Sequence, residues 1–153
     1  MERRSLLRNV YLFSDFSDAE LGEIEEIAQP QAHAGSVELF REGQDADSLL
    51  IIKYGSVQIA QSGDNNTVML ATLGSGAHFG EMSLLDAEPR SATARTLEDS
   101  ELVVIAYDKL RAVLDAQPAI AAKFYRALAL YLGGRLRATS SDLNFARSRK
   151  SGR

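Results

Sequence analysis

Residues 79–94 read FGEMSLLDAEPRSATA, and the interpretation of the whole chain depends on this stretch. It begins with a glycine and a carboxylate, Gly80 and Glu81, and it closes on Arg90 followed by the hydroxyl of Ser91. Glycine lets another group approach the backbone closely because it has no Cβ. An arginine offers planar donors that match phosphate oxygens, whereas a carboxylate only accepts hydrogen bonds and therefore suits the hydroxyls of a sugar. Together these groups predict a nucleotide-binding site.

The stretch resembles the phosphate-binding cassette of cyclic nucleotide-binding domains, whose pattern is Phe-Gly-Glu, small and apolar residues, then Pro-Arg-Ser/Ala-Ala. The filled signature positions are Phe79, Gly80, Glu81, Ser83, Leu84, Leu85, Pro89, Arg90, Ser91 and Ala92. The resemblance covers about residues 10–137. It implies a mainly β fold: an antiparallel β-roll or jelly-roll barrel with N-terminal helices and two C-terminal helices.

The resemblance also implies how the ligand, cAMP or possibly cGMP, is held. Glu81 is expected to accept a hydrogen bond from the ribose 2′-hydroxyl, and Arg90 is expected to hold the cyclic phosphate. The other expected ligand-binding residues are Gly80, Met82, Ser83, Ser91 and Ala92 in the cassette, with Ile59 and Leu70 lining the purine.

Two details of base recognition follow from the same resemblance. Leu132 and Arg135 of the last helix are both candidates for covering the base, and the sequence does not choose between them. A threonine at the position of Ser91 is associated with guanine in the family, so the serine favours adenine slightly.

Composition places the chain among soluble globular domains. It has 153 residues, 45% hydrophobic and 25% charged, with no cysteine and hence no disulfide or thiolate chemistry. No apolar run approaches the ~18 residues of a membrane span, and the N-terminus has no signal-peptide core. These features favour the cytoplasm. Residues 118–153 hold eight basic side chains and one acid, Asp142, which gives this segment a charge of +7. Because the net charge of the chain is −4, residues 1–117 carry −11.

The pattern of apolar residues predicts four regions along the chain. Residues 1–34 are expected to be helical, with a capping box at Ser17–Glu20 and an end at Pro30. Residues 35–107 are expected to form the β-roll, with the cassette at 79–93. The expected strands are 36–41, 48–54, 56–61, 67–73, 91–97 and 101–107. Residues 108–137 are expected to form two lid helices, and 138–153 a basic, flexible tail.

Three other classes of function were weighed against the sensor. A cupin-like β-barrel enzyme would need clustered metal ligands, but the two histidines, His33 and His78, lie outside any supporting motif, so we expect neither a metal nor catalysis. A DNA-binding regulator would need a helix-turn-helix, and only about sixteen residues follow the long helix. A ligand-independent interaction domain remains open. The last helix is apolar nearly all round, which favours an effector protein or a second copy as partner.

Overall fold

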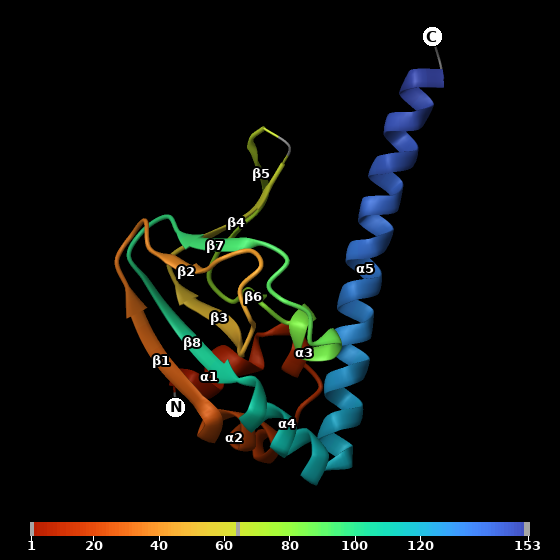
Figure 1. The fold of residues 1–153 in the computed structure, drawn as a ribbon. Coiled ribbons are helices and arrows are strands. Elements are labelled where there is room, and N and C mark those ends of the chain that lie inside the picture. Colours follow the sequence, from red (N-terminus) through yellow and green to blue (C-terminus); the bar gives the residue numbers. More distant parts are fainter. Residues whose placement is uncertain (1, 64, 152–153) are drawn as a thin grey trace.

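The computed structural model describes the backbone of residues 2–63 and 65–151 and the side chains of residues 4–63 and 65–138. Its strands form two antiparallel sheets that close into a roll (Figure 1). The first sheet has the order β1-β8-β3-β6, and the second has the order β2-β7-β4-β5. The strands are β1 (Ala28–His33), β2 (Glu38–Phe40), β3 (Ser48–Tyr54), β4 (Val57–Ser62), β5 (Thr67–Leu73), β6 (His78–Phe79), β7 (Thr93–Thr96) and β8 (Ser100–Ala106). The predicted β-roll is confirmed.

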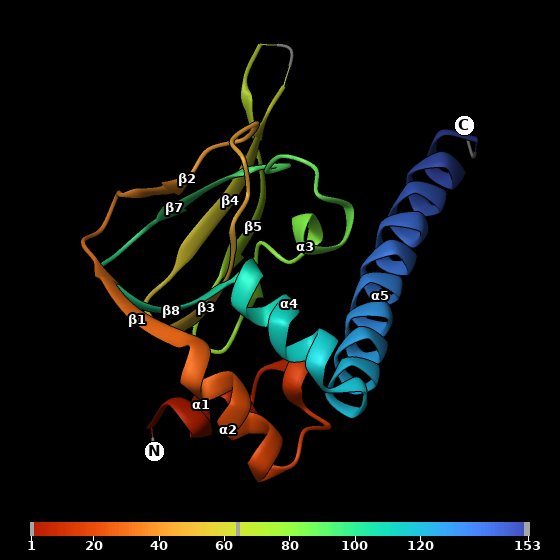
Figure 2. The same cartoon turned by 60° about the horizontal axis from the view of Figure 1, so that its bottom comes forward.

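Helices flank this roll in three places. In chain order, the helices before the roll are α1 (Glu2–Arg8), the 3-10 helix η1 (Tyr11–Phe13) and α2 (Asp18–Ile27). The short helix α3 (Met82–Asp86) lies between β6 and β7. The helices after the roll are α4 (Tyr107–Ala116) and α5 (Pro118–Ser151). Figure 2 shows α1, α2 and α4 gathered at one end of the roll with the start of α5. The predicted capping box is present, because Ser17 accepts from the Glu20 N–H while the Glu20 carboxylate accepts from the Ser17 N–H.

Two apolar clusters hold these parts together. One lies between the sheets and contains Leu50, Ile52, Val57, Phe79, Ala94 and Leu102. The other joins the helices to the first sheet, and in it the Phe13 ring stacks on that of Phe124 of α5 with centroids 6.1 Å apart. Phe79 therefore anchors the start of the cassette in the core, while Ile120, Phe124 and Leu128 anchor the first part of α5.

The N-terminal prediction was wrong at one element. The segment expected to be helical, 1–34, contains the strand β1, and α2 ends at Ile27 rather than at Pro30. Pro30 lies inside β1, which is an edge strand paired with β8. An edge strand tolerates proline because one side of its backbone needs no ladder hydrogen bond.

The C-terminal prediction was also wrong. Helix α5 does not end near residue 137 but continues to Ser151, so most of the basic tail 138–153 is helical; residues 152–153 lie outside the described part. Its flexibility stays a prediction. In Figures 1 and 2 the far end of α5 stands clear of the roll. Within the described residues, no helix combines the length and the apolar character needed to cross a membrane.

Candidate ligand-binding site

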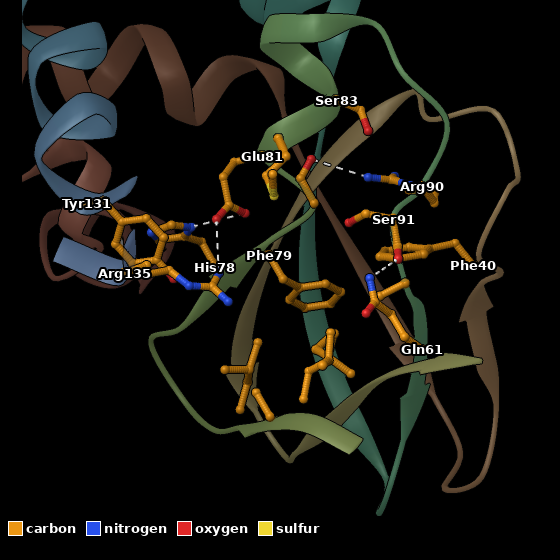
Figure 3. A pocket seen from close by; sticks show the side chains of 17 residues that line it. Phe40, Gln61, His78, Phe79, Glu81, Ser83, Arg90, Ser91, Tyr131 and Arg135 are labelled. Carbon is orange, nitrogen blue, oxygen red and sulfur yellow. Dashed lines mark hydrogen bonds and ion pairs between the residues drawn. The ribbon is translucent and has the colours of Figure 1, made fainter. Parts of the chain in front are cut away.

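A cavity of about 470 Å³ lies between the second sheet, the cassette and α5 (Figure 3). That volume falls within the usual range for small-molecule sites. Its walls are Phe40, Ile59, Gln61, Leu70, Ala71, Leu73, His78, Phe79, Gly80, Glu81, Met82, Ser83, Arg90, Ser91, Ala92, Tyr131 and Arg135. All nine residues expected from the sequence therefore surround one cavity, although their contact with a ligand stays a prediction.

Gly80 sits where the cassette leaves β6, and two observations show why only glycine fits. Its φ of +81° lies in the left-handed region, which side chains disfavour. A Cβ at this position would also come within 2.6 Å of Arg90 Nη1. The Gly80 carbonyl in turn accepts hydrogen bonds from Arg90 Nη1, at 3.2 Å, and from the Tyr107 hydroxyl.

Arg90 is 4% exposed and is held mainly by neutral groups. Its Nη2 donates to the Ser48 carbonyl at 2.9 Å, and its Nη1 donates to the Tyr107 hydroxyl at 3.2 Å as well as to the Gly80 carbonyl. The guanidinium carbon lies 4.0 Å from the centroid of the Phe40 ring, a cation–π contact. None of these partners carries a charge. The buried Arg90 Nε has no hydrogen-bond partner among the described residues, so one donor of the guanidinium remains available to an anion that enters the cavity.

Other cassette residues and Gln61 of β4 complete the cavity wall around Arg90. The Ser91 side chain is exposed, and its carbonyl accepts from Gln61 Nε2 at 2.8 Å. Ser83 and Ala92 are buried, whereas the Met82 side chain is 47% exposed. Gln61 was not expected from the sequence. It lies two residues beyond Ile59 on the same face of β4, and that alternation could have indicated it.

Glu81 forms the other polar end of the cavity, at a distance from Arg90 (Figure 3). The whole residue is only 2% exposed. Glu81 Oε2 lies 3.6 Å from His78 Nδ1, and Glu81 Oε1 lies 4.0 Å from Arg135 Nη1. A buried carboxylate with both oxygens near potential donors is suited to accept hydrogen bonds from a ligand hydroxyl.

Helix α5 supplies the wall beside Glu81. Arg135 lines the cavity, whereas Leu132, the other candidate for covering the base, does not. Tyr131 also lines it, four residues before Arg135 on the same face of the helix, and its ring centroid is 4.4 Å from that of His78. Burial raises the pKa of the Tyr131 hydroxyl, with a smaller contribution from the Glu81 carboxylate. Sequence reasoning missed Tyr131 and His78, because their proximity arises from a contact between distant segments.

Part of the cavity wall is apolar. It includes Ile59, which is half-buried, and Leu70, which is 47% exposed, together with Leu73 and Phe79. Exposed apolar surface lining a cavity can carry the face of a heterocycle. In chemical terms the cavity combines a cationic end, a hydroxyl-accepting end and an apolar wall.

Tyr107 connects this site to the helices that follow the roll. It is the first residue of α4, is 2% exposed, and donates its hydroxyl hydrogen to the Gly80 carbonyl. Burial raises the pKa of this hydroxyl, and the nearby Arg90 charge opposes that rise. The tyrosine thus fixes the start of α4 to both ends of the cassette.

The structure also bears on the metal-dependent alternative. Over the residues that are described, no group of three or more His, Cys, Asp or Glu side chains is placed to hold a metal ion. His33 and His78 lie on different strands, β1 and β6, and only His78 lines the cavity.

Comparison with known proteins decides the family. The sequence model of the cyclic nucleotide-binding domain matches residues 32–117, which is more than half of the chain. The chain belongs to the cyclic nucleotide-binding domain family. That match includes all of the roll after β1 and the whole cassette, so the resemblance read from residues 79–94 is confirmed.

Solved and curated relatives agree with this membership. A cyclic nucleotide-binding domain from Methylobacillus flagellatus superimposes with a TM-score of 0.80 at 29% identity, covering 92% of this chain and 80% of that one. The Toxoplasma gondii PKA regulatory domain, solved with cAMP, gives a TM-score of 0.70 at 27% identity over 73% of this chain and 43% of that one. The CRP-like cAMP-activated global transcriptional regulator of Mycobacterium tuberculosis is 29% identical over 90% of this chain, which spans 60% of the regulator.

Proposed function

We propose that this cyclic nucleotide-binding domain is a sensor that binds cAMP and converts binding into a change in the position of α4 and α5. The observation that carries the proposal is the composition of the cavity wall. The cassette supplies Arg90 and Glu81, and α5 supplies Tyr131 and Arg135 to the same cavity. A ligand that fills the cavity therefore contacts both the fixed roll and the helix.

The proposed pose places each part of cAMP against a matching group. The cyclic phosphate lies at Arg90, beside Ser91 and the Ala92 N–H; the ribose 2′-hydroxyl lies at Glu81; and the purine rests on Ile59 and Leu70. Similarity to the Toxoplasma domain solved with cAMP, and to the cAMP-activated regulator, supports cAMP as the ligand. Ser91 favours adenine over guanine slightly, so weaker cGMP binding is part of the proposal.

The coupling to the helices runs through Tyr107 in this proposal. Arg90 donates to Tyr107, and both side chains hold the Gly80 carbonyl. A phosphate that draws Arg90 toward itself competes with these bonds and loosens the start of α4. Binding shifts such an equilibrium only by as much as the ligand prefers one arrangement over the other.

The output in this proposal is a protein contact and not a reaction. Helix α5 buries Phe124 and Leu128 against the domain, while Tyr125, Leu130 and Leu136 are 43%, 57% and 67% exposed. These exposed side chains would meet an effector protein or a second copy of the chain, in the cytoplasm. Light scattering of the purified protein with and without cAMP distinguishes the two partners. If the partner is a second copy, cAMP should change the measured molecular mass of the purified protein; if it is an effector protein, that mass should stay constant.

Distance measurements between spin labels test the sensor directly. The chain contains no cysteine, so labels are confined to introduced sites. One label at Gly74, where an added Cβ meets no atom within 4 Å, pairs with a second at the exposed Ala129 of α5. Adding cAMP should shift this distance distribution, whereas a control pair at Gly74 and Gln29, both in the roll, should stay constant. Binding of cAMP with both distributions unchanged would refute the sensor mechanism.

A further inference from the structure

His78 is an unusual residue in the wall of the cavity. It is 5% exposed, yet neither ring nitrogen has a hydrogen-bond partner among the described residues. Its backbone is fixed, because β6 pairs with β3 and sets His78 opposite Ile51. A buried imidazole is normally paired, since leaving its nitrogens unpaired is unfavourable. The position of this ring at the cavity wall therefore points to a partner that comes from the ligand.

The distance between His78 and Glu81 indicates what that partner is. His78 Nδ1 and Glu81 Oε2 are 3.6 Å apart, which is too long for a hydrogen bond between them. It is short enough for one oxygen atom to lie within hydrogen-bond distance of both. A hydroxyl is the group that fits, because it donates one hydrogen and accepts through its lone pairs. A carbonyl or a phosphate oxygen could accept from His78 but would have no hydrogen to give Glu81.

We propose that His78 is a further ligand-binding residue, which together with Glu81 recognises a single ribose-type hydroxyl from both sides. The Glu81 carboxylate accepts the hydroxyl hydrogen, and the His78 Nδ1–H donates to the hydroxyl oxygen. The inference rests on the proposed function, in which that hydroxyl is the 2′-hydroxyl of a cyclic nucleotide. It makes His78 a determinant of the preference for a ribonucleotide over its 2′-deoxy analogue.

Neighbouring groups hold the two side chains in this arrangement. Arg135 approaches the other carboxylate oxygen, Oε1, at 4.0 Å, so it leaves Oε2 on the side of His78. The Tyr131 ring lies against the imidazole at a centroid distance of 4.4 Å and a tilt of 54°. Figure 3 shows the four side chains meeting at the α5 side of the cavity. These contacts orient the pair and also enclose it, because both ring nitrogens of His78 are buried. A hydroxyl therefore enters between His78 and Glu81 only when the α5 side chains beside them move, which agrees with the proposed displacement of α5.

Calorimetric titration of two variants with cAMP and 2′-deoxy-cAMP tests the inference. His78→Phe keeps a ring against Tyr131 but removes both nitrogens, and His33→Phe changes the other histidine as a control. The wild type should bind cAMP at least ~10-fold more tightly than the deoxy analogue, because a missing hydroxyl leaves buried polar groups unpaired. His78→Phe should lower that ratio by about 5- to 10-fold, mainly by weakening cAMP, whereas His33→Phe should leave it unchanged.

A conservative variant and a spectroscopic measurement separate recognition from a structural role. His78→Asn places an amide donor near the position of Nδ1, so it should restore part of the ratio. In the wild type, nitrogen NMR of the ring of His78 should change on adding cAMP and change less with the deoxy analogue, with His33 as internal reference. This readout needs no variant, so it decides the question even if His78→Phe fails to fold.

The outcomes distinguish the two levels of the proposal. Absence of cAMP binding by the wild type would overturn the nucleotide site itself. Normal cAMP binding with the same ratio in His78→Phe, or with identical His78 ring signals for the two ligands, would overturn the role of His78 alone.

Discussion

Replacing Arg90 with lysine is the sharpest test of the phosphate end of the site. The guanidinium now reaches Ser48, Gly80 and Tyr107 with two nitrogens. Lysine keeps the positive charge but has a single ammonium group, which cannot bind the carbonyls and a phosphate in the same fork geometry. The variant thus removes the two-nitrogen hydrogen bonding of the guanidinium while keeping the positive charge at this position.

The expected loss of affinity follows from the number of bonds removed. A hydrogen bond to a charged group contributes about 1.5–3 kcal/mol, and lysine gives up at least one of the two that a guanidinium makes to a phosphate. We expect cAMP binding to weaken by ~2 kcal/mol, which is about 30-fold. The free energy of unfolding should also fall, by roughly 1–3 kcal/mol, because buried carbonyls lose their donor.

Calorimetric titration measures the affinity, and urea unfolding checks that the protein is folded under the same conditions. Arg95→Lys is the matched control, because Arg95 lies on β7 close to Arg90 in sequence but is exposed and pairs with Glu38. It should bind cAMP as the wild type does. A folded Arg90→Lys protein whose dissociation constant stays within about threefold of wild type would show that the phosphate does not bind at Arg90.

Two further predictions concern stability and the shape of the cassette. Gly80→Ala should lower the cAMP affinity, and it should lower the free energy of unfolding by ~1 kcal/mol or more. Gly55 is also at positive φ but lies away from the cavity, so Gly55→Ala should lower only the free energy of unfolding. Equal losses of cAMP affinity in titrations of the two variants would contradict this. The hydrogen bond from Lys123 lowers the pKa of Glu20 below 4.5, so the pair stabilises the fold above that pH and the gain is lost as the pH falls through and below it. Glu20→Gln should therefore lower the melting temperature at pH 7 and flatten its decline below pH 4.5; an unchanged slope in melting curves would refute this.

The sequence predicted the roll and the cassette because their signals are local. The spacing of Gly80 and Arg90 identified the cassette, and turn residues separated most strands. The signals failed where local chemistry was ambiguous: Pro30 resembles a helix end but lies in an edge strand. Beyond residue 137 the chain lacks an apolar stripe, yet α5 continues.

The site shows the same division between local and distant information. All nine expected residues surround the cavity, because most lie in the cassette or on the facing strands. His78 and Tyr131 were missed, since their contact joins β6 to α5 across more than fifty residues of chain. The hydrogen bond from Arg90 to the Ser48 carbonyl could not be predicted from residue spacing either. Contacts of this kind depend on how the finished elements pack.

Titration of the unmodified protein with cAMP and cGMP by calorimetry tests the central claim most directly. We predict saturable binding of cAMP with one site per chain and weaker binding of cGMP. A folded protein that binds neither nucleotide at high micromolar concentrations would contradict the proposal that this domain senses a cyclic nucleotide.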